Sequence, residues 1–192
     1  PVHLSGAIDS PGADKAARFV KLCDAFDIPL VTLIDTPGMM VGPEVEKTAL
    51  VRHCSRLFLA GANAEVPMIS IITRKSYGLG AQAMAGGSFR TPVFIAGWPT
   101  AEIGGMGLEG AVKLGFRKEL EAIEDLAERQ AYFEARVAES YERGKAVNAA
   151  AILEFDTVID PADTRRWIAA TLDSAPPPPR REGKKRAFVD SW

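Results

Sequence analysis

The sequence predicts an α/β fold in which buried strands alternate with helices. Two apolar runs, Leu30 to Ile34 and Met68 to Thr73, are continuous rather than alternating, which is typical of parallel strands covered on both faces. A third run extends from Val93 to Ala96. Glycine or proline follows these runs, and helical periodicity separates them. Each strand is therefore expected to lead through a turn into a helix.

Helices are expected before and between these strands. Ser10-Pro11 predicts a helix start, with Ser10 as the cap and proline at the first helical position. Apolar residues at helical spacing mark the face expected to be buried: Ala16, Phe19, Val20, Cys23 and Phe26. A second helix is expected through Leu50, Cys54, Leu57 and Phe58. A short helix should follow directly after Gly78-Leu79-Gly80.

Beyond Gly110 the chain is more charged and is expected to be helical. One face of a long amphipathic segment carries Leu120, Ile123, Leu126, Phe133, Val137 and Tyr141, and Gly144 is the expected stop. A last helix is expected from Pro161 to Ser174, with Asp160 as its cap. We therefore expect one domain over residues 1–174. Residues 175–192, with consecutive prolines and a basic run, are expected to form an extended, solvated tail.

Composition is that of an ordinary globular protein: 47% of the 192 residues are hydrophobic and 25% are charged. The net charge of −2 offers no argument for nucleic-acid binding. No window reaches the ~18 apolar residues that a membrane span requires, and no signal peptide is visible. Cys23 and Cys54 are interpreted as buried thiols in a reducing compartment. We expect a cytoplasmic protein. Because the chain starts at Pro1, we also expect it to belong to a longer polypeptide or to be a surviving fragment.

The segment from Ile71 to Met84 carries the strongest indication of a functional site. A β-branched apolar run ends, the turn Gly78-Leu79-Gly80 follows, and an alanine-rich helix begins at once. The first N–H groups of a helix have no intrahelical acceptor and can face a partner that develops negative charge. Two glycines without Cβ atoms allow a ligand to approach the backbone closely.

Three loops should lie beyond the carboxyl ends of the strands, where ligands gather in open α/β sheets. They span Asp35 to Gly42, Arg74 to Gly80, and Trp98 to Gly107, and all are rich in glycine and proline. Such loops either punctuate strand-to-helix turns or form a ligand site, and both interpretations stay open. A Walker loop is absent, and a dinucleotide fingerprint would need a glycine at Ala83.

Side-chain catalysis has few candidates. His3 and His53 are interpreted as structural or surface residues, and neither a Ser-His-Asp set nor a metal-binding cluster is evident. Asp35 is either a functional acid or, more in keeping with its position, a turn cap. Arg74 and Lys75 either meet phosphates or are exposed charges. Stabilisation by backbone amides is the mechanism that the sequence best supports.

Several segments together resemble the carboxyltransferase subunits of biotin-dependent acyl-CoA carboxylases. They are Ile72-Thr73-Arg74-Lys75-Ser76-Tyr77-Gly78-x-Gly80, Lys15-Ala16-Ala17-Arg18-Phe19, Ile28-Pro29-Leu30-Val31, Asp35-Thr36-Pro37-Gly38 and Trp98-Pro99-Thr100-Ala101-Glu102-Ile103. The resemblance covers about residues 4–172. It implies a crotonase/ClpP-like fold of ββα-type repeats with C-terminal helices, in which each subunit has two related halves. This chain resembles the second, C-terminal half only.

The resemblance also implies a mechanism. In the family, carboxybiotin carried on a partner protein delivers its carboxyl group to the α-carbon of an acyl-CoA, and biotin is not bound covalently to this chain. The N–H groups of Leu79 and Gly80 would hold the ureido oxygen of biotin, while an oxyanion hole in the first half holds the thioester enolate. The implied substrate-binding residues are Tyr77, Gly78, Gln82, Gly38 and Gly42.

The implied partners are an acyl-CoA, a biotin carboxylase or biotin carboxyl carrier subunit, and the N-terminal carboxyltransferase half. The family assembles as trimers of dimers, so a homo-oligomer is expected, with no nucleic-acid or membrane partner. Gln82 stands where propionyl-type members can have Asp. The Gly-x-Gly form, with Met39-Met40-Val41-Gly42 after Pro37-Gly38, more closely resembles the branch that handles methylcrotonyl- or geranyl-type substrates. Two alternatives stay open: a biotin-dependent decarboxylase of the same fold, and a non-catalytic assembly module.

Overall fold

The computed structural model describes residues 3–180 and 182–190, which form an α/β domain around a parallel sheet. The strand order is β1-β2-β3-β5, and β4 pairs with the last residues of β2. The strands are β1 (Leu30–Thr36), β2 (Met68–Tyr77), β3 (Phe94–Gly97), β4 (Glu102–Gly104) and β5 (Thr157–Val158). The predicted α/β class with a parallel sheet is confirmed.

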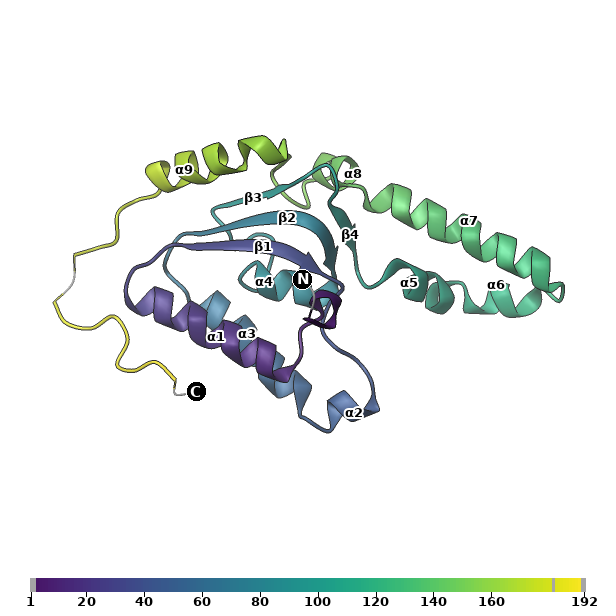
Figure 1. Ribbon diagram of the computed structural model, residues 1–192, viewed down its shortest axis with the longest axis horizontal. Coiled ribbons are helices and arrows are strands. Elements are labelled where there is room, and N and C mark those ends of the chain that lie inside the picture. The colour runs from purple at the N-terminus through teal and green to yellow at the C-terminus, as the bar shows by residue number, and fades with distance from the viewer. Residues whose placement is uncertain (1–2, 181, 191–192) are drawn as a thin grey trace.

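Helices cover both faces of this sheet (Figure 1). On one side lie α1 (Ser10–Ala25), α3 (Leu50–Ala62) and α4 (Gly78–Met84), and on the other lies α9 (Thr164–Ser174). An arm extends sideways and consists of α5 (Leu108–Gly115), α6 (Arg117–Ala122) and α7 (Leu126–Gly144). The short elements are η1 (His3–Gly6), α2 (Pro43–Glu46), α8 (Ala146–Ala151) and η2 (Pro161–Asp163). Within the described residues, no helix is both long enough and apolar enough to cross a membrane.

The start and the buried face of α1 differ from the prediction. Asp9, not Ser10, is the cap, because its Oδ1 accepts a 2.8 Å hydrogen bond from the Gly12 N–H. Ser10 is the first helical residue, and its hydroxyl pairs with Thr48 instead. The buried stripe is narrower than expected: Ala13, Ala17, Val20 and Cys23 face α3, whereas Phe19 and Phe26 are exposed. Small alanines at the contact allow the two helices to approach closely.

The two long strands differ in burial. In β2, the residues from Met68 to Ile72 are all buried, as expected for a strand covered on both faces. In β1, Val31 and Leu33 are exposed, so the prediction of two-sided burial is wrong there. The reason is position: β1 is an edge strand, and α9 packs against β2 and β3 rather than against β1. The helical core with α1 and α3 lies on the other face of the sheet.

Two predicted boundaries also move. β2 continues past Thr73 to Tyr77, because Lys75, Ser76 and Tyr77 pair with Glu102, Ile103 and Gly104 of β4. The long charged segment after Gly110 is broken before α7, where Asp125 caps the new helix by accepting from the Glu128 N–H. Gly144 ends α7 as predicted. Asp160 caps the short η2 rather than α9 itself.

The C-terminal segment is exposed at residues 176–180 and 182–184, whereas Lys185, Arg186 and Asp190 contact the domain. The segment returns to α1 and α3 (Figure 1), and Lys185 Nζ lies 2.6 Å from Asp24 Oδ1. Arg186 reaches the second oxygen of Asp24, and Asp190 forms ion pairs with Lys21 and Arg56. A buried carboxylate on α1 therefore attracts the basic run and binds it to the domain.

Candidate active site

Glycines bring the ends of β1, β2 and β4 into backbone contact. A Cβ atom on Gly80 would lie 2.7 Å from the Cα of Gly38, and one on Gly78 would lie 2.8 Å from the carbonyl oxygen of Gly105. Gly78 also has a φ of +57°, which favours glycine. Both approaches leave no room for a side chain. The structure thus gathers the three glycine-rich loops that the sequence placed at one edge of the sheet.

The α4 start presents backbone donors. The helix begins at Gly78 directly after the extended residue Tyr77, and no side chain in the described parts of the chain caps it. The N–H groups of Leu79 and Gly80 lie in its first turn, where the helix itself supplies no acceptor. The Leu79 side chain is exposed, and Gly80 is buried against the loop that contains Gly38. The first turn of a helix can present such N–H groups to a ligand that carries negative charge.

A pocket of about 530 Å³ lies in front of this turn. Gly78, Leu79 and Gln82 line it from α4, and Ser140 and Arg143 line it from α7. The contribution of α7 was missed in the sequence, because Ser140 and Arg143 lie some sixty residues beyond the turn and belong to no motif. A usable signal was Gly144: a Cβ there would lie 2.6 Å from the carbonyl oxygen of Ile103, so glycine allows α7 to end against β4.

Ser76 lies at the base of the same pocket. The residue is fully buried, and its hydroxyl has no hydrogen-bond partner within residues 3–180 and 182–190. Buried hydroxyls are normally paired, so an unpaired one is a local energetic cost.

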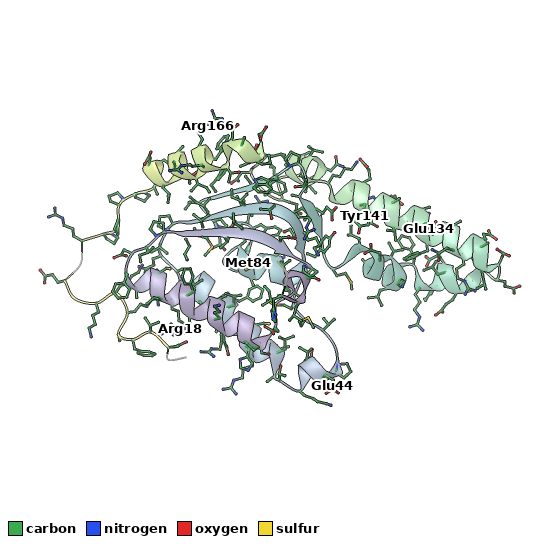
Figure 2. All side chains as sticks on the ribbon, viewed as in Figure 1. Arg18, Glu44, Met84, Glu134, Tyr141 and Arg166 are labelled. Carbon is green, nitrogen blue, oxygen red and sulfur yellow. The ribbon has the colours of Figure 1, made fainter. Side chains whose placement is uncertain are left out.

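Tyr77, expected as a substrate-binding residue, is buried within the fold with 4% of its surface exposed. Its hydroxyl donates a 2.8 Å hydrogen bond to Glu102 Oε2. Burial raises the pKa of Tyr77, and the Glu102 carboxylate raises it further, so the phenol stays protonated. Nearby, the hydroxyl of Tyr141 donates to Glu109 Oε1 at 2.8 Å, and Figure 2 shows Tyr141 on the part of α7 nearer the sheet.

Asp35 is held by the neighbouring strand. Its Oδ2 accepts a 2.9 Å hydrogen bond from Arg74 Nη2, and its Oδ1 accepts from the Lys75 N–H. Burial raises the pKa of Asp35, but the hydrogen bonds from Arg74 and Lys75 outweigh it, so the pKa lies below the ordinary value. These contacts favour the structural role of Asp35 over that of a functional acid.

Of the two remaining expected site residues, Gly38 lies at the turn and Gly42 does not line the pocket, and His53 lies elsewhere as expected of a structural residue. Gly38 supports Gly80 from behind, through the contact described above. Gly42 has a φ of +124° at the start of α2 and is not one of the residues that line the pocket at Gly78. His53 pairs through Nδ1 with Asp14 on the helical side of the sheet. Among the described residues, no group of three or more His, Cys, Asp or Glu side chains is arranged to hold a metal ion.

Comparison with known proteins identifies the family of this chain. Residues 1–187 match the family described as the carboxyl transferase domain. The chain is 42% identical over 177 residues to the methylmalonyl-CoA carboxyltransferase 12S subunit of Propionibacterium freudenreichii subsp. shermanii, an alignment that covers 90% of this chain and 32% of that protein. The chain therefore spans about a third of the length of the curated relatives that it matches.

Solved structures show the same fold. A single-chain, multi-domain long-chain acyl-CoA carboxylase is 54% identical, with a TM-score of 0.78 over 88% of this chain and 16% of that one. The transcarboxylase 12S structure with methylmalonyl-CoA and methylmalonic acid bound is 38% identical, with a TM-score of 0.80 over 96% of this chain and 35% of that one. The fold is thus the crotonase-like fold of carboxyltransferases. The chain belongs to the carboxyl transferase domain family.

Proposed function

We propose that this chain is the biotin-binding, C-terminal half of an acyl-CoA carboxyltransferase. The observation that carries the proposal is the uncapped start of α4, where the N–H groups of Leu79 and Gly80 lie beside a pocket of about 530 Å³. Family membership supports the class of reaction. Among the described residues that line the pocket, only Arg143 and Glu154 carry charged side chains, which fits chemistry that depends on backbone donors.

The pocket and its donors fit the head group of biotin. Carboxybiotin, when bound, supplies the carboxyl group that is transferred. The N–H groups of Leu79 and Gly80 donate to the ureido oxygen and stabilise the negative charge that develops there. Each such donor contributes about 3–4 kcal/mol to a transition state. The glycine contacts at positions 38, 78, 80 and 105 hold both donors in place before the ligand arrives.

This chain matches about a third of the length of its relatives, so other parts of the enzyme must contribute to acyl-CoA recognition. We propose that an N-terminal half supplies the acyl-CoA site and the enolate hole, and that a biotin carboxyl carrier delivers the cofactor. Gln82 is exposed at the pocket and is the proposed contact for the acyl group. The transcarboxylase 12S structure is described as a hexamer assembly, which supports an oligomer here too. The buried thiols of Cys23 and Cys54 support a reducing, cytoplasmic location.

The test is carboxyl transfer between a malonyl-type CoA and free biotin, with this chain assembled with the rest of the carboxyltransferase. Leu79→Pro removes one proposed donor in the first turn of a helix, where proline is tolerated. We expect a loss of turnover on the order of a hundredfold or more. Ala127→Pro, at the second residue of α7, is the matched control and should keep near-normal turnover.

A ligand readout complements the assay. Free biotin should slow hydrogen exchange at the amides of Leu79 and Gly80, and Leu79→Pro should weaken that effect at Gly80. Unchanged turnover in Leu79→Pro, together with no biotin-dependent protection, would show that the turn is not the biotin site. It would favour the non-catalytic assembly module.

A further inference from the structure

We infer that Tyr77 and Glu102 are a positioning pair that holds the Gly78–Gly80 turn in place for its ligand. Tyr77 is the last residue of β2, immediately before the turn, and its hydroxyl lies 2.8 Å from Glu102 Oε2 on β4. This role rests on the proposed function, because the turn matters only if its amides bind a ligand.

Tyr77 is restrained at both ends. Its backbone pairs with Gly104 in the parallel β2–β4 ladder, while its side chain reaches back to Glu102. The ring packs over Gly104, since a Cβ atom there would lie 3.3 Å from Tyr77 Cδ1. A buried phenol with one strong acceptor has a single favoured orientation. A change in the backbone position of Tyr77 would therefore move Gly78, the first residue of α4.

The carbonyl of Tyr77 links the pair to the second supporting glycine. A Cβ atom on Gly38 would lie 3.4 Å from that carbonyl oxygen, and Gly38 in turn lies against Gly80. A small displacement of Tyr77 thus reaches the amides of Leu79 and Gly80 by two routes, along the chain and through Gly38. Donor placement within a few tenths of an ångström matters for this kind of stabilisation.

Glu102 connects the turn to the arm. It forms an antiparallel bridge with Lys145, directly after α7, and the Ala146 N–H donates to the carbonyl of Ala101 at 3.0 Å. Glu102 therefore contacts both the residue that precedes the turn, Tyr77, and the residue that follows α7, Lys145. We infer that the position of α7 and the orientation of the two amides are set together.

The experiment compares Tyr77→Phe, Glu102→Ala and Glu102→Gln in the assembled carboxyltransferase, with Tyr132→Phe on α7 as the matched control. Tyr77→Phe and Glu102→Ala should lower kcat about tenfold, the effect of one lost hydrogen bond, while KM for acyl-CoA changes less than twofold. Glu102→Gln keeps an acceptor oxygen and should restore most of kcat. Hydrogen exchange of the peptide from Tyr77 to Met84 should quicken in the two impaired variants only.

Equal loss in Glu102→Gln and Glu102→Ala, or unchanged exchange in Tyr77→Phe, would overturn the positioning role. A kcat effect matched by Tyr132→Phe would overturn it as well. If the unsubstituted enzyme transfers no carboxyl group, the proposed function fails. The exchange measurement still decides whether Tyr77 and Glu102 order the turn, so the two failures are distinguishable.

Discussion

Lys185 Nζ lies 2.6 Å from Asp24 Oδ1, and the two side chains are 7% and 1% exposed. Asp24 also accepts from the Glu65 N–H and from Arg186. The carboxylate thus sits in the body of the domain with several donors around it, which is the condition for burying a charge. This carboxylate, together with the ion pairs of Asp190 with Lys21 and Arg56, holds the end of the C-terminal segment against α1 and α3.

Breaking this buried pair should destabilise the domain. Asp24→Ala leaves Lys185 buried with only weaker partners, and removal of one member of a buried ion pair costs about 3–5 kcal/mol. We expect the lower end, because Asp27 and Glu65 lie within 3.5 Å and 3.4 Å of Lys185 Nζ. Urea denaturation measures the change. Glu121→Ala, which breaks the exposed pair with Arg117, should leave the urea unfolding curve almost unchanged, and an effect as large as that of Asp24→Ala would contradict this account.

The same carboxylate predicts a pH dependence. Burial raises the pKa of Asp24, but the hydrogen bonds from Lys185, Glu65 and Arg186 outweigh it, so the folded-state pKa lies below the unfolded value of about 4. A lowered folded-state pKa stabilises the protein above the unfolded pKa, and this contribution is lost as pH falls through the folded pKa. Unfolding free energy should therefore drop below about pH 4. Asp24→Asn should show a smaller drop between pH 6 and pH 3, and a parallel curve would refute the assignment.

Removal of the unpaired Ser76 hydroxyl should stabilise the domain. Ser76→Ala deletes a buried polar atom that lacks a partner among the described residues, and relief of such a group contributes about 1 kcal/mol or more. The midpoint of urea unfolding should rise. Ser70→Ala is the matched control: its hydroxyl is buried but pairs with Thr32 at 2.7 Å, so this change should destabilise. Loss of stability in both variants would mean that Ser76 has a partner in solution.

Gly80→Ala should disrupt the turn through backbone overlap. The new methyl group would meet the Cα, carbonyl carbon and carbonyl oxygen of Gly38 at 2.7, 2.6 and 3.0 Å, and none of these atoms belongs to a flexible side chain. Overpacking of this kind costs about 1–3 kcal/mol. The rate of the proposed reaction should fall even under conditions in which the variant is fully folded. Gly115→Ala, where a Cβ atom meets nothing within 4 Å, should be neutral or stabilising by up to about 1 kcal/mol.

Local features were predictable because short-range physics determines them. The apolar run of β2 and a short helix directly after it were both predicted, although β2 continues to Tyr77 and the helix already begins at Gly78. Gly144 ends α7 as expected. Edge position was not predictable, since nothing in the run from Leu30 to Ile34 shows that α9 leaves β1 uncovered on one face.

The sequence by itself determined the α/β class and the glycine turn at Gly78 to Gly80, because the apolar runs, the helix starts and the glycine conformations depend on neighbouring residues. Tertiary structure alone decided what surrounds that turn. Tyr77 meets Glu102 across 25 residues, and Asp24 meets Lys185 across 161. Such pairs depend on how strands and helices pack. The residues next to a buried polar group in the sequence do not indicate which distant side chain will form its hydrogen bond.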